Sequence, residues 1–227
     1  MSHTTGDGYG FADGIPIGPV TPGTTLLVAG PSMSRAEEVA LSMVAEGVAH
    51  DEGALFISTN MTCEKLLATC GKARPGLGSS RVGVIDCSGQ DLGRARFEAQ
   101  VKVVSTQSDL TGIGMKFSSL YESLYADARE GRVRTGLVSL SSLSMYVDLR
   151  TLFQFAQTLS GRIDSARGLG AFTIDPTTHD TRTVNTLDQI ADGRVEVRER
   201  DDDTVAGELR VRGLPGHDDD WRPFSLD

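Results

Sequence analysis

The chain has 227 residues, 39% of them hydrophobic, and a formal net charge of −9. This length fits one large α/β domain or two small ones, with enough apolar residues for a core. The acidic balance disfavours non-specific nucleic-acid binding, because no basic patch stands out to neutralise phosphates. No apolar run reaches membrane-spanning length, and the Gly-rich start lacks the basic and apolar regions of a secretory signal. We therefore expect a cytoplasmic protein without a membrane span.

The cysteines form an odd and widely spaced set, Cys63, Cys70 and Cys87. This spacing matches neither a disulfide framework nor the short paired spacings of a zinc site. We expect all three to be reduced and to pack as small hydrophobic side chains. The sequence predicts no metal site.

Short apolar segments alternate along the chain with longer segments of helical periodicity. The apolar segments predict strands that are covered on both faces. They are Thr24–Ala29, Ala54–Ser58, Val82–Ile85, Val101–Val104, Thr135–Leu140 and Ala171–Ile174. Between them, apolar stripes at helical spacing predict helices that face the core rather than a cofactor. The stripes are Val39, Ala40, Met43, Val44 and Gly47; Phe117, Leu120, Tyr121, Leu124 and Tyr125; and Leu149, Leu152, Phe153, Ala156 and Ile163.

The alternation of strand and helix predicts a three-layer α/β fold with a mostly parallel, twisted sheet. Near the end of the chain the apolar period becomes two, in Arg194–Arg198 and Glu208–Arg212, on either side of a turn at Asp201–Asp203. This pattern predicts a C-terminal antiparallel β-hairpin. We expect one domain over residues 14–212, a flexible N-terminus at 1–13 and an acidic tail at 213–227.

The first predicted strand leads into an eight-residue loop and a helix, which is the context of the phosphate-binding motif G-x-x-x-x-G-K-[ST]. Gly30 holds the first position of this motif. Arg35 replaces the second Gly, where a long side chain hinders wrapping of the backbone around phosphates. Ala36 replaces the Lys whose charge lies between the β- and γ-phosphates. Glu37 replaces the Ser/Thr that holds Mg²⁺ and adds a negative charge.

Two serines of the same loop, Ser32 and Ser34, are further members of this degenerate site. Ser34 and Glu37 have the spacing of a capping box, with Ser34 as the N-cap. In that arrangement the protein satisfies the N–H groups that a phosphate-binding loop offers to its ligand. A well-capped helix in an ordinary α/β protein predicts the same local structure.

Several segments in common order resemble the KaiC branch of the RecA-like P-loop ATPases over nearly the whole chain. They are Gly14–Gly18, Phe56–Leu67, Ser141–Ser144, Asp192–Val197 and Val211–Phe224. These resemble the family's G-G-[IL]-P-x-G, Y-I-S-F-E-E-S-P-E-Q-L-L, D-S-L-S, A-D-G-V-I-x-L and M-R-G…H…P-F segments. The resemblance implies a RecA/KaiC-type fold with degenerate Walker A and Walker B motifs.

The departures from the family pattern affect phosphate grip, metal binding and water activation together. The family's adjacent catalytic glutamates fall on Asn60 and Met61, and its Walker B aspartate falls on Ser141. Losing one charge-stabilising group often costs on the order of 10²–10³ in rate. We therefore expect no catalytic residue and no ordinary ATP hydrolysis.

The M-R-G…H segment is retained, since Arg210, Arg212 and His217 occupy comparable positions. In KaiC-like rings this segment reaches the neighbouring subunit's nucleotide, and an arginine supplied in trans can stabilise phosphoryl charge. These residues are therefore candidate trans-acting or interface residues. The alternation of the hairpin is equally compatible with solvated, outward-facing arginines.

We therefore expect a non-catalytic regulatory or interaction subunit without a cofactor, acting in a homo-oligomer or with an active KaiC-like ATPase. The alternative is a nucleotide-binding protein or weak ATPase, in which Arg35 replaces the missing Lys and ATP binds without efficient hydrolysis. A third hypothesis is an enzyme using Asp175 and His179, although Asp175 also fits a turn. The aromatics of the tail, Trp221 and Phe224, either dock on a partner or fold back onto the sheet.

Overall fold

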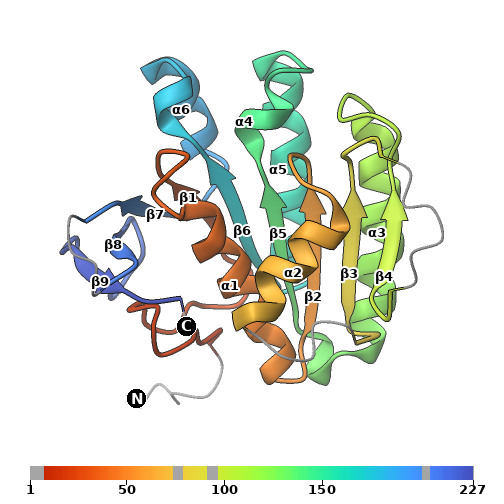
Figure 1. The fold of residues 1–227 in the computed structure, drawn as a ribbon, viewed down its shortest axis with the longest axis horizontal. Coiled ribbons are helices and arrows are strands. Elements are labelled where there is room, and N and C mark those ends of the chain that lie inside the picture. Colours follow the sequence, from red (N-terminus) through yellow and green to blue (C-terminus); the bar gives the residue numbers. More distant parts are fainter. Residues whose placement is uncertain (1–7, 74–78, 91–96, 201–204, 227) are drawn as a thin grey trace.

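A computed structural model describes residues 8–73, 79–90, 97–200 and 205–226. Its sheet has nine strands in the order β4-β3-β2-β5-β6-β1-β7-β8-β9 (Figure 1). The strands are β1 (Thr25–Ala29), β2 (Gly53–Ser58), β3 (Val82–Asp86), β4 (Gln100–Val103), β5 (Val133–Val138), β6 (Leu169–Ile174), β7 (Gly193–Arg198), β8 (Gly207–Arg212) and β9 (Arg222–Phe224). The α-helices are α1 (Ala36–Ala49), α2 (Cys63–Ala73), α3 (Leu110–Asp127), α4 (Leu140–Leu143), α5 (Leu149–Ser165) and α6 (Thr181–Asp188).

Across the sheet, β4, β3, β2, β5, β6, β1 and β7 are all parallel to one another. Helices cover both faces of this part of the sheet. Helices α1 and α2 pack on one face, and α3 to α6 pack on the other. The predicted three-layer, mostly parallel fold with a C-terminal antiparallel hairpin is therefore confirmed. Within the described ranges, no helix combines the length and apolar character needed to cross a membrane.

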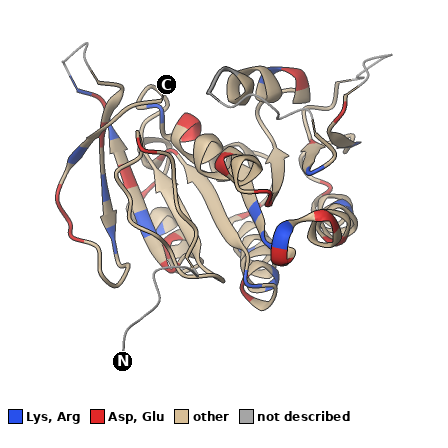
Figure 2. Cartoon of the chain, turned by 90° about the horizontal axis from the view of Figure 1, so that it is seen from below, with Lys and Arg blue, Asp and Glu red and all other residues tan. Residues whose placement is uncertain are grey.

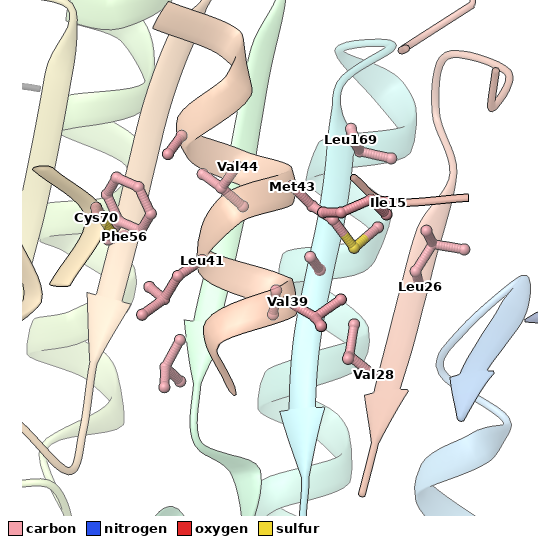
Figure 3. Packing of buried hydrophobic residues seen from close by; sticks show 14 of the residues in the cluster. Ile15, Leu26, Val28, Val39, Leu41, Met43, Val44, Phe56, Cys70 and Leu169 are labelled. Atoms are coloured by element: carbon pink, nitrogen blue, oxygen red, sulfur yellow. The ribbon is translucent and has the colours of Figure 1, made fainter. Parts of the chain in front are cut away.

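Helix α1 lies across the middle of the sheet and forms the centre of one core. Its stripe, which includes Val39, Met43 and Val44, is fully buried against strand residues such as Leu26 and Phe56 (Figure 3). Burying a side chain of this size contributes roughly 1.5–3 kcal/mol. This packing fixes the start of α1, and hence the loop that precedes it, against the ends of β1 and β6.

The other predicted helical stripes face the second core, with one exception. Phe117, Leu120, Tyr121 and Leu124 of α3 are buried, but Tyr125 at the end of the stripe is 48% exposed. The stripe drifts around the helix, and by its last turn it has left the sheet. All three cysteines are buried and free, as predicted, and burial raises the pKa of each thiol to about 12.

One strand ends earlier than its apolar run predicts. The run continues to Leu140, but β5 ends at Val138, and Leu140 begins the short helix α4. The apolar run does not mark the end of the strand because Val138 and Leu140 are both buried, Val138 in β5 and Leu140 in α4. Ser141 consequently lies in the first turn of α4 rather than directly after the strand.

The C-terminal part of the chain forms the antiparallel edge of the sheet. Strand β7 pairs with β8, with Val195 opposite Val211, as the alternation predicts. The predicted turn at Asp201–Asp203 lies outside the described residues. The tail folds back onto its own sheet: β9 pairs with β8, and Phe224 is buried. The predicted boundary at residue 213 therefore cuts through the domain.

The N-terminal segment is also part of the domain where it is described. Tyr9 is fully buried, forms a β-bridge with Val20 and donates its hydroxyl to the carbonyl oxygen of Arg167 at 3.0 Å. The prediction of a flexible segment through residue 13 was wrong for this part, because the sequence gives no sign of what covers Tyr9. Residues 1–7 lie outside the described ranges.

Tyr9 packs against a buried cluster of charged side chains at the amino ends of β2 and β5. Glu52 accepts from Arg132 at 2.8 Å and from Arg134 at 2.5 Å. Arg134 also donates to the backbone carbonyls of Gly10 and Met43, at 2.8 and 2.9 Å. The guanidinium of Arg132 stacks on the Tyr9 ring at 4.1 Å. We call Tyr9, Glu52, Arg132 and Arg134 the N-terminal clamp.

Candidate functional site

The loop after β1 lies at the carboxyl edge of the parallel sheet, where ligand sites of open α/β folds are found (Figure 1). Gly30 begins it and must be small, since a Cβ there would lie 2.3 Å from Ser34 Oγ and 2.7 Å from the Val197 carbonyl oxygen. Ser34 is buried, and both its N–H and its hydroxyl donate to the carbonyl of Pro31, at 2.9 and 2.7 Å. The loop is thus closed by its own bonds.

The predicted capping box is wrong. The N-cap of α1 is Arg35, in the left-handed region at φ 62°, and no side chain caps this helix end. The Ser34 hydroxyl turns back to Pro31 instead of toward the helix, and Glu37 reaches a different loop. The Arg35 side chain makes a 4.0 Å contact with Glu38, and about half of it is exposed.

Asp175, which follows β6, binds Ser32 in the loop between β1 and α1. This is the loop in which a phosphate-binding motif would lie. Its Oδ2 accepts from the N–H of Ser32 at 2.9 Å and from the Ser32 hydroxyl at 2.6 Å. Its Oδ1 accepts from the N–H and the hydroxyl of Thr177, at 2.9 and 2.6 Å. The predicted turn at Asp175 is therefore confirmed. Partial burial opposes ionisation, but the four donors hold the pKa of Asp175 below its usual value.

Glu37 extends from the first turn of α1 toward the loop after β2. The amide Nδ2 of Asn60 donates to Glu37 Oε1 at 2.7 Å. Burial raises the pKa of Glu37, and the bond from Asn60 and the charge of Lys65 oppose this rise. Asp175 and Glu38 act in the same direction as burial. Negative charge therefore accumulates at the start of α1.

Ser141 joins a third loop to this edge. Its Oγ accepts from the N–H of Asp175 at 2.9 Å and lies 2.9 Å from His179 Nε2. His179 thus contacts Ser141, whereas the sequence suggested a pair with Asp175. Ser32, Ser141, Asp175 and His179 connect the loops that follow β1, β5 and β6, and we call them the loop lock.

The loop lock could be predicted only in part. Ser32, Ser141 and Asp175 each stand out in the sequence, but the bonds between them depend on β6 lying between β1 and β5. No local pattern specifies that strand order. The useful signal is that each residue follows a buried strand, and parallel strands end at one edge. In the described ranges, no group of three or more His, Cys, Asp or Glu side chains could hold a metal ion.

The remaining predicted residues lie away from this edge. Arg212 pairs in register with Arg194 at the start of β7, which is the opposite end of that strand from the loop. Arg210 binds Glu196 at 2.5 Å and stacks on Trp221 at 4.7 Å. Figure 2 shows charges of both signs side by side on these strands.

The two candidate interface residues that follow Arg210 are less firmly held. Arg212 is 52% exposed, and its contacts with Glu196 and Asp219 are both 3.6 Å long. His217 has 3.3 Å contacts with the carbonyls of Gly18 and Pro215. Of the predicted set, Arg212 is therefore the cation most available to another molecule.

The sequence model of a family of unknown function, DUF7504, matches residues 23–197. A search of curated proteins finds no match. Among solved structures, a KaiC-like protein from Pyrococcus horikoshii superposes with a TM-score of 0.66 and 13% identity, covering 92% of this chain and 89% of its own. An uncharacterised protein from the same organism, in complex with an unknown peptide, gives 0.65 and 13%, covering 88% of each chain. The flagellar accessory protein FlaH from Methanocaldococcus jannaschii gives 0.64 and 10%, covering 92% and 88%. The chain therefore has a RecA/KaiC-like fold.

Proposed function

Since the chain belongs to this family of unknown function, we propose from its own residues that it is a non-catalytic regulatory or interaction subunit. The observation that carries the proposal is the bond between Asp175 and Ser32. A phosphate-binding loop presents free N–H groups to its ligand. Here a carboxylate of the same chain takes the N–H and the hydroxyl of Ser32.

The charges at this edge support the same conclusion. Glu37, Glu38 and Asp175 surround the loop, and Ala36 occupies the place of the phosphate-binding Lys. A triphosphate would have to approach these carboxylates and displace Asp175 from Ser32. Because phosphoryl transfer relies on positioning and on positive charge, this arrangement disfavours ATP hydrolysis.

A site of this kind that neither binds nor hydrolyses ATP can still serve to bind another protein. We propose a cytoplasmic protein that works in an oligomer, either with copies of itself or with an active KaiC-like ATPase. Support comes from the fold shared with a KaiC-like protein and from a similar structure that contains an unknown peptide. Arg212 is the proposed trans-acting residue, because it is exposed and only weakly paired.

Thermal melts with and without ATP·Mg²⁺ test the absence of nucleotide binding. We expect no shift of the midpoint. A ligand present at a concentration of about 100 times its Kd would add roughly 2.7 kcal/mol to the free energy of unfolding, and a change of this size is easily measured. Mg²⁺ alone and salt of equal ionic strength are the controls. A clear upward shift with ATP·Mg²⁺ beyond these controls would contradict the proposal.

The second candidate is nucleotide binding without efficient hydrolysis. It is favoured by Arg35, whose side chain is half exposed and whose one ion pair among the described residues is the 4.0 Å contact with Glu38, so that the guanidinium could turn toward a phosphate. On this hypothesis ATP raises the melting temperature, and Arg35→Ala removes the rise. The exposed Arg182→Ala variant on α6 should leave it unchanged.

The role of Arg212 is tested with an active KaiC-like ATPase as the bait. We expect the chain to be retained on the bait and to change its ATPase rate, and we expect Arg212→Ala to reduce the rate change. Arg150→Ala, an exposed arginine at the start of α5, is the matched control. Equal effects of the wild-type chain and Arg212→Ala would remove Arg212 from the proposal.

A further inference from the structure

A groove of about 410 Å³ lies beside the loop lock, at the carboxyl ends of β2, β3 and β5. Its walls come from the loop after β2, the first turn of α2, the loop after β3, the loop before α3, and α4 with the residues that follow it. This volume lies within the range of small binding sites in proteins. Asn60 and Met61 belong to its wall, so the groove adjoins the degenerate site without including the loop after β1.

The chemistry of the lining is unusual for the surface of an acidic protein. Lys65 is the one residue of the lining whose side chain is charged at neutral pH. Amide groups come from Asn60, Gln90 and Gln107, and hydroxyls come from Thr62, Ser88 and Ser142. Amides and hydroxyls both donate and accept hydrogen bonds, as a peptide backbone requires of its binding site.

One side of the groove is apolar and open to solvent. Met145 is 81% exposed and Tyr146 is 51% exposed, although both are large and largely apolar. Met61, which also lines the groove, is partly buried and packs on the core. Methionine and tyrosine side chains adapt readily to the apolar groups of a ligand. This rim therefore offers a place for one apolar side chain.

The floor of the groove is fixed before any ligand arrives. The hydroxyl of Thr59 lies 2.9 and 3.0 Å from the carbonyls of Val138 and Ser139 and accepts from the N–H of Ser139 at 2.7 Å. The hydroxyl of Ser58 donates to the Met61 carbonyl at 2.6 Å. A site held by buried bonds loses little entropy when it binds, which favours affinity.

We propose that this groove binds an extended segment of a partner protein that carries an apolar side chain next to an acidic one. The apolar side chain lies between Met61, Met145 and Tyr146, the backbone meets the amides and hydroxyls, and the carboxylate pairs with Lys65. A single cation matches one carboxylate, whereas a nucleic acid would need several cations. The inference rests on the proposed function, because it names the kind of partner that the degenerate site serves.

The test uses the full chain and an array of immobilised short peptides. Every peptide carries one apolar residue, Leu, Phe or Met, and one charged residue at varied spacing. Matched peptides replace the acidic residue by Lys or the apolar residue by Ser. We expect the apolar–acidic peptides to bind at least about tenfold more tightly than either matched set, which corresponds to about 1.4 kcal/mol.

Variants of the chain place the binding in the groove. Tyr146→Ala and Met145→Ala should each weaken binding several-fold, because both side chains are exposed and their loss leaves the core intact. Lys65→Glu should reverse the charge preference, so that peptides with Lys bind better than peptides with Asp or Glu. Met115→Ala, another exposed methionine that lies outside the groove, should change nothing.

Several outcomes overturn the inference: no peptide binding, a preference of the wild-type chain for basic peptides, equal binding by Lys65→Glu, or displacement of the peptide by a single-stranded oligonucleotide. The melts with ATP·Mg²⁺ keep the two proposals separate. If no peptide binds and ATP has no effect, only this inference fails. If ATP binds, the proposed function fails whatever the array shows.

Discussion

Charged side chains lie at both ends of the parallel sheet, but their partners differ between the two ends. At the amino end, the buried carboxylate of Glu52 binds two arginines, and Arg134 also satisfies two backbone carbonyls. At the carboxyl end, Glu37 and Asp175 accept hydrogen bonds from neutral amide and hydroxyl groups, and neither forms an ion pair with an arginine among the described residues. The first cluster is compensated by arginines in direct contact, whereas the second is held by neutral hydrogen-bond donors, with only the charge of Lys65 acting on Glu37.

This difference separates a structural device from a site with a potential ligand. Breaking a compensated buried pair leaves a charge without a partner and is costly, so the N-terminal clamp holds Tyr9 and the ends of β2 and β5. A partly exposed carboxylate held by neutral donors contributes less to stability and leaves its surroundings open to the hydrogen-bonding groups of another molecule. The carboxyl end is therefore where partners and ligands can act, and the predictions below compare the two ends.

The largest effect is expected at the clamp. Arg134→Ala should lower the free energy of unfolding by about 3–5 kcal/mol, because Glu52 loses its closest partner and the carbonyls of Gly10 and Met43 lose their donor. Urea unfolding at neutral pH measures the loss.

The matched control at the same end of the sheet is Arg129→Ala. Arg129 is 68% exposed and makes a 3.9 Å contact with Glu130, so we expect a change within about 0.5 kcal/mol. Arg134→Lys, which retains the charge without the guanidinium fork, should fall between the two. If Arg134→Ala is as stable as Arg129→Ala, the clamp has no structural role.

A smaller effect is expected at the loop lock. Asp175→Asn places an amide NH₂ against two donors, from Ser32 or from Thr177, and should cost about 1–2 kcal/mol at neutral pH. Because the folded-state pKa of Asp175 lies below its ordinary value of 3.8, the carboxylate stabilises the fold above that pH. The stabilisation is lost as the pH falls through the folded-state pKa.

Urea unfolding at neutral pH and well below pH 3.8 checks this dependence. The difference between wild type and Asp175→Asn should disappear in acid. Glu122→Gln, an exposed change on α3, should have no effect at either pH. A loss from Asp175→Asn that is the same at both pH values would mean that the charge of Asp175 is unimportant.

The strands and helices could be predicted from the sequence where burial is complete. The continuous apolar runs of β1, β2 and β6 have one possible location, inside a covered sheet, and the alternation of β7 and β8 fixes their inward faces. Prediction failed where burial alone does not distinguish elements. Leu140 is as buried in α4 as it would be in β5, and the apolar run therefore does not show where the strand ends.

The candidate site could be predicted as a set of residues but not as a set of bonds. The residue types at Ala36, Glu37 and Asn60 predict a degenerate phosphate-binding loop, and this stays a prediction. The capping box failed because α1 begins one residue later than the box requires, with Arg35 in the left-handed region as its N-cap. The bond between Ser32 and Asp175 spans 143 positions and depends on strand order, which no local pattern specifies.

The smallest effect is expected at Glu37, and its sign is opposite to that at Asp175. Because burial raises the folded-state pKa of Glu37 above 4.5, the ionised carboxylate lowers stability at neutral pH. This cost fades as the pH falls through the folded-state pKa and is absent below 4.5. Glu37→Gln retains an acceptor for Asn60 and removes the charge, so it should raise the free energy of unfolding at neutral pH by up to about 1 kcal/mol. Glu38→Gln, at the half-exposed neighbouring position, is the control and should have little effect. Urea unfolding of both variants at neutral pH is the measurement. A loss of stability in Glu37→Gln would show that the negative charge of Glu37 stabilises the carboxyl end, as the charge of Glu52 stabilises the clamp. The contrast between the two ends would then no longer hold.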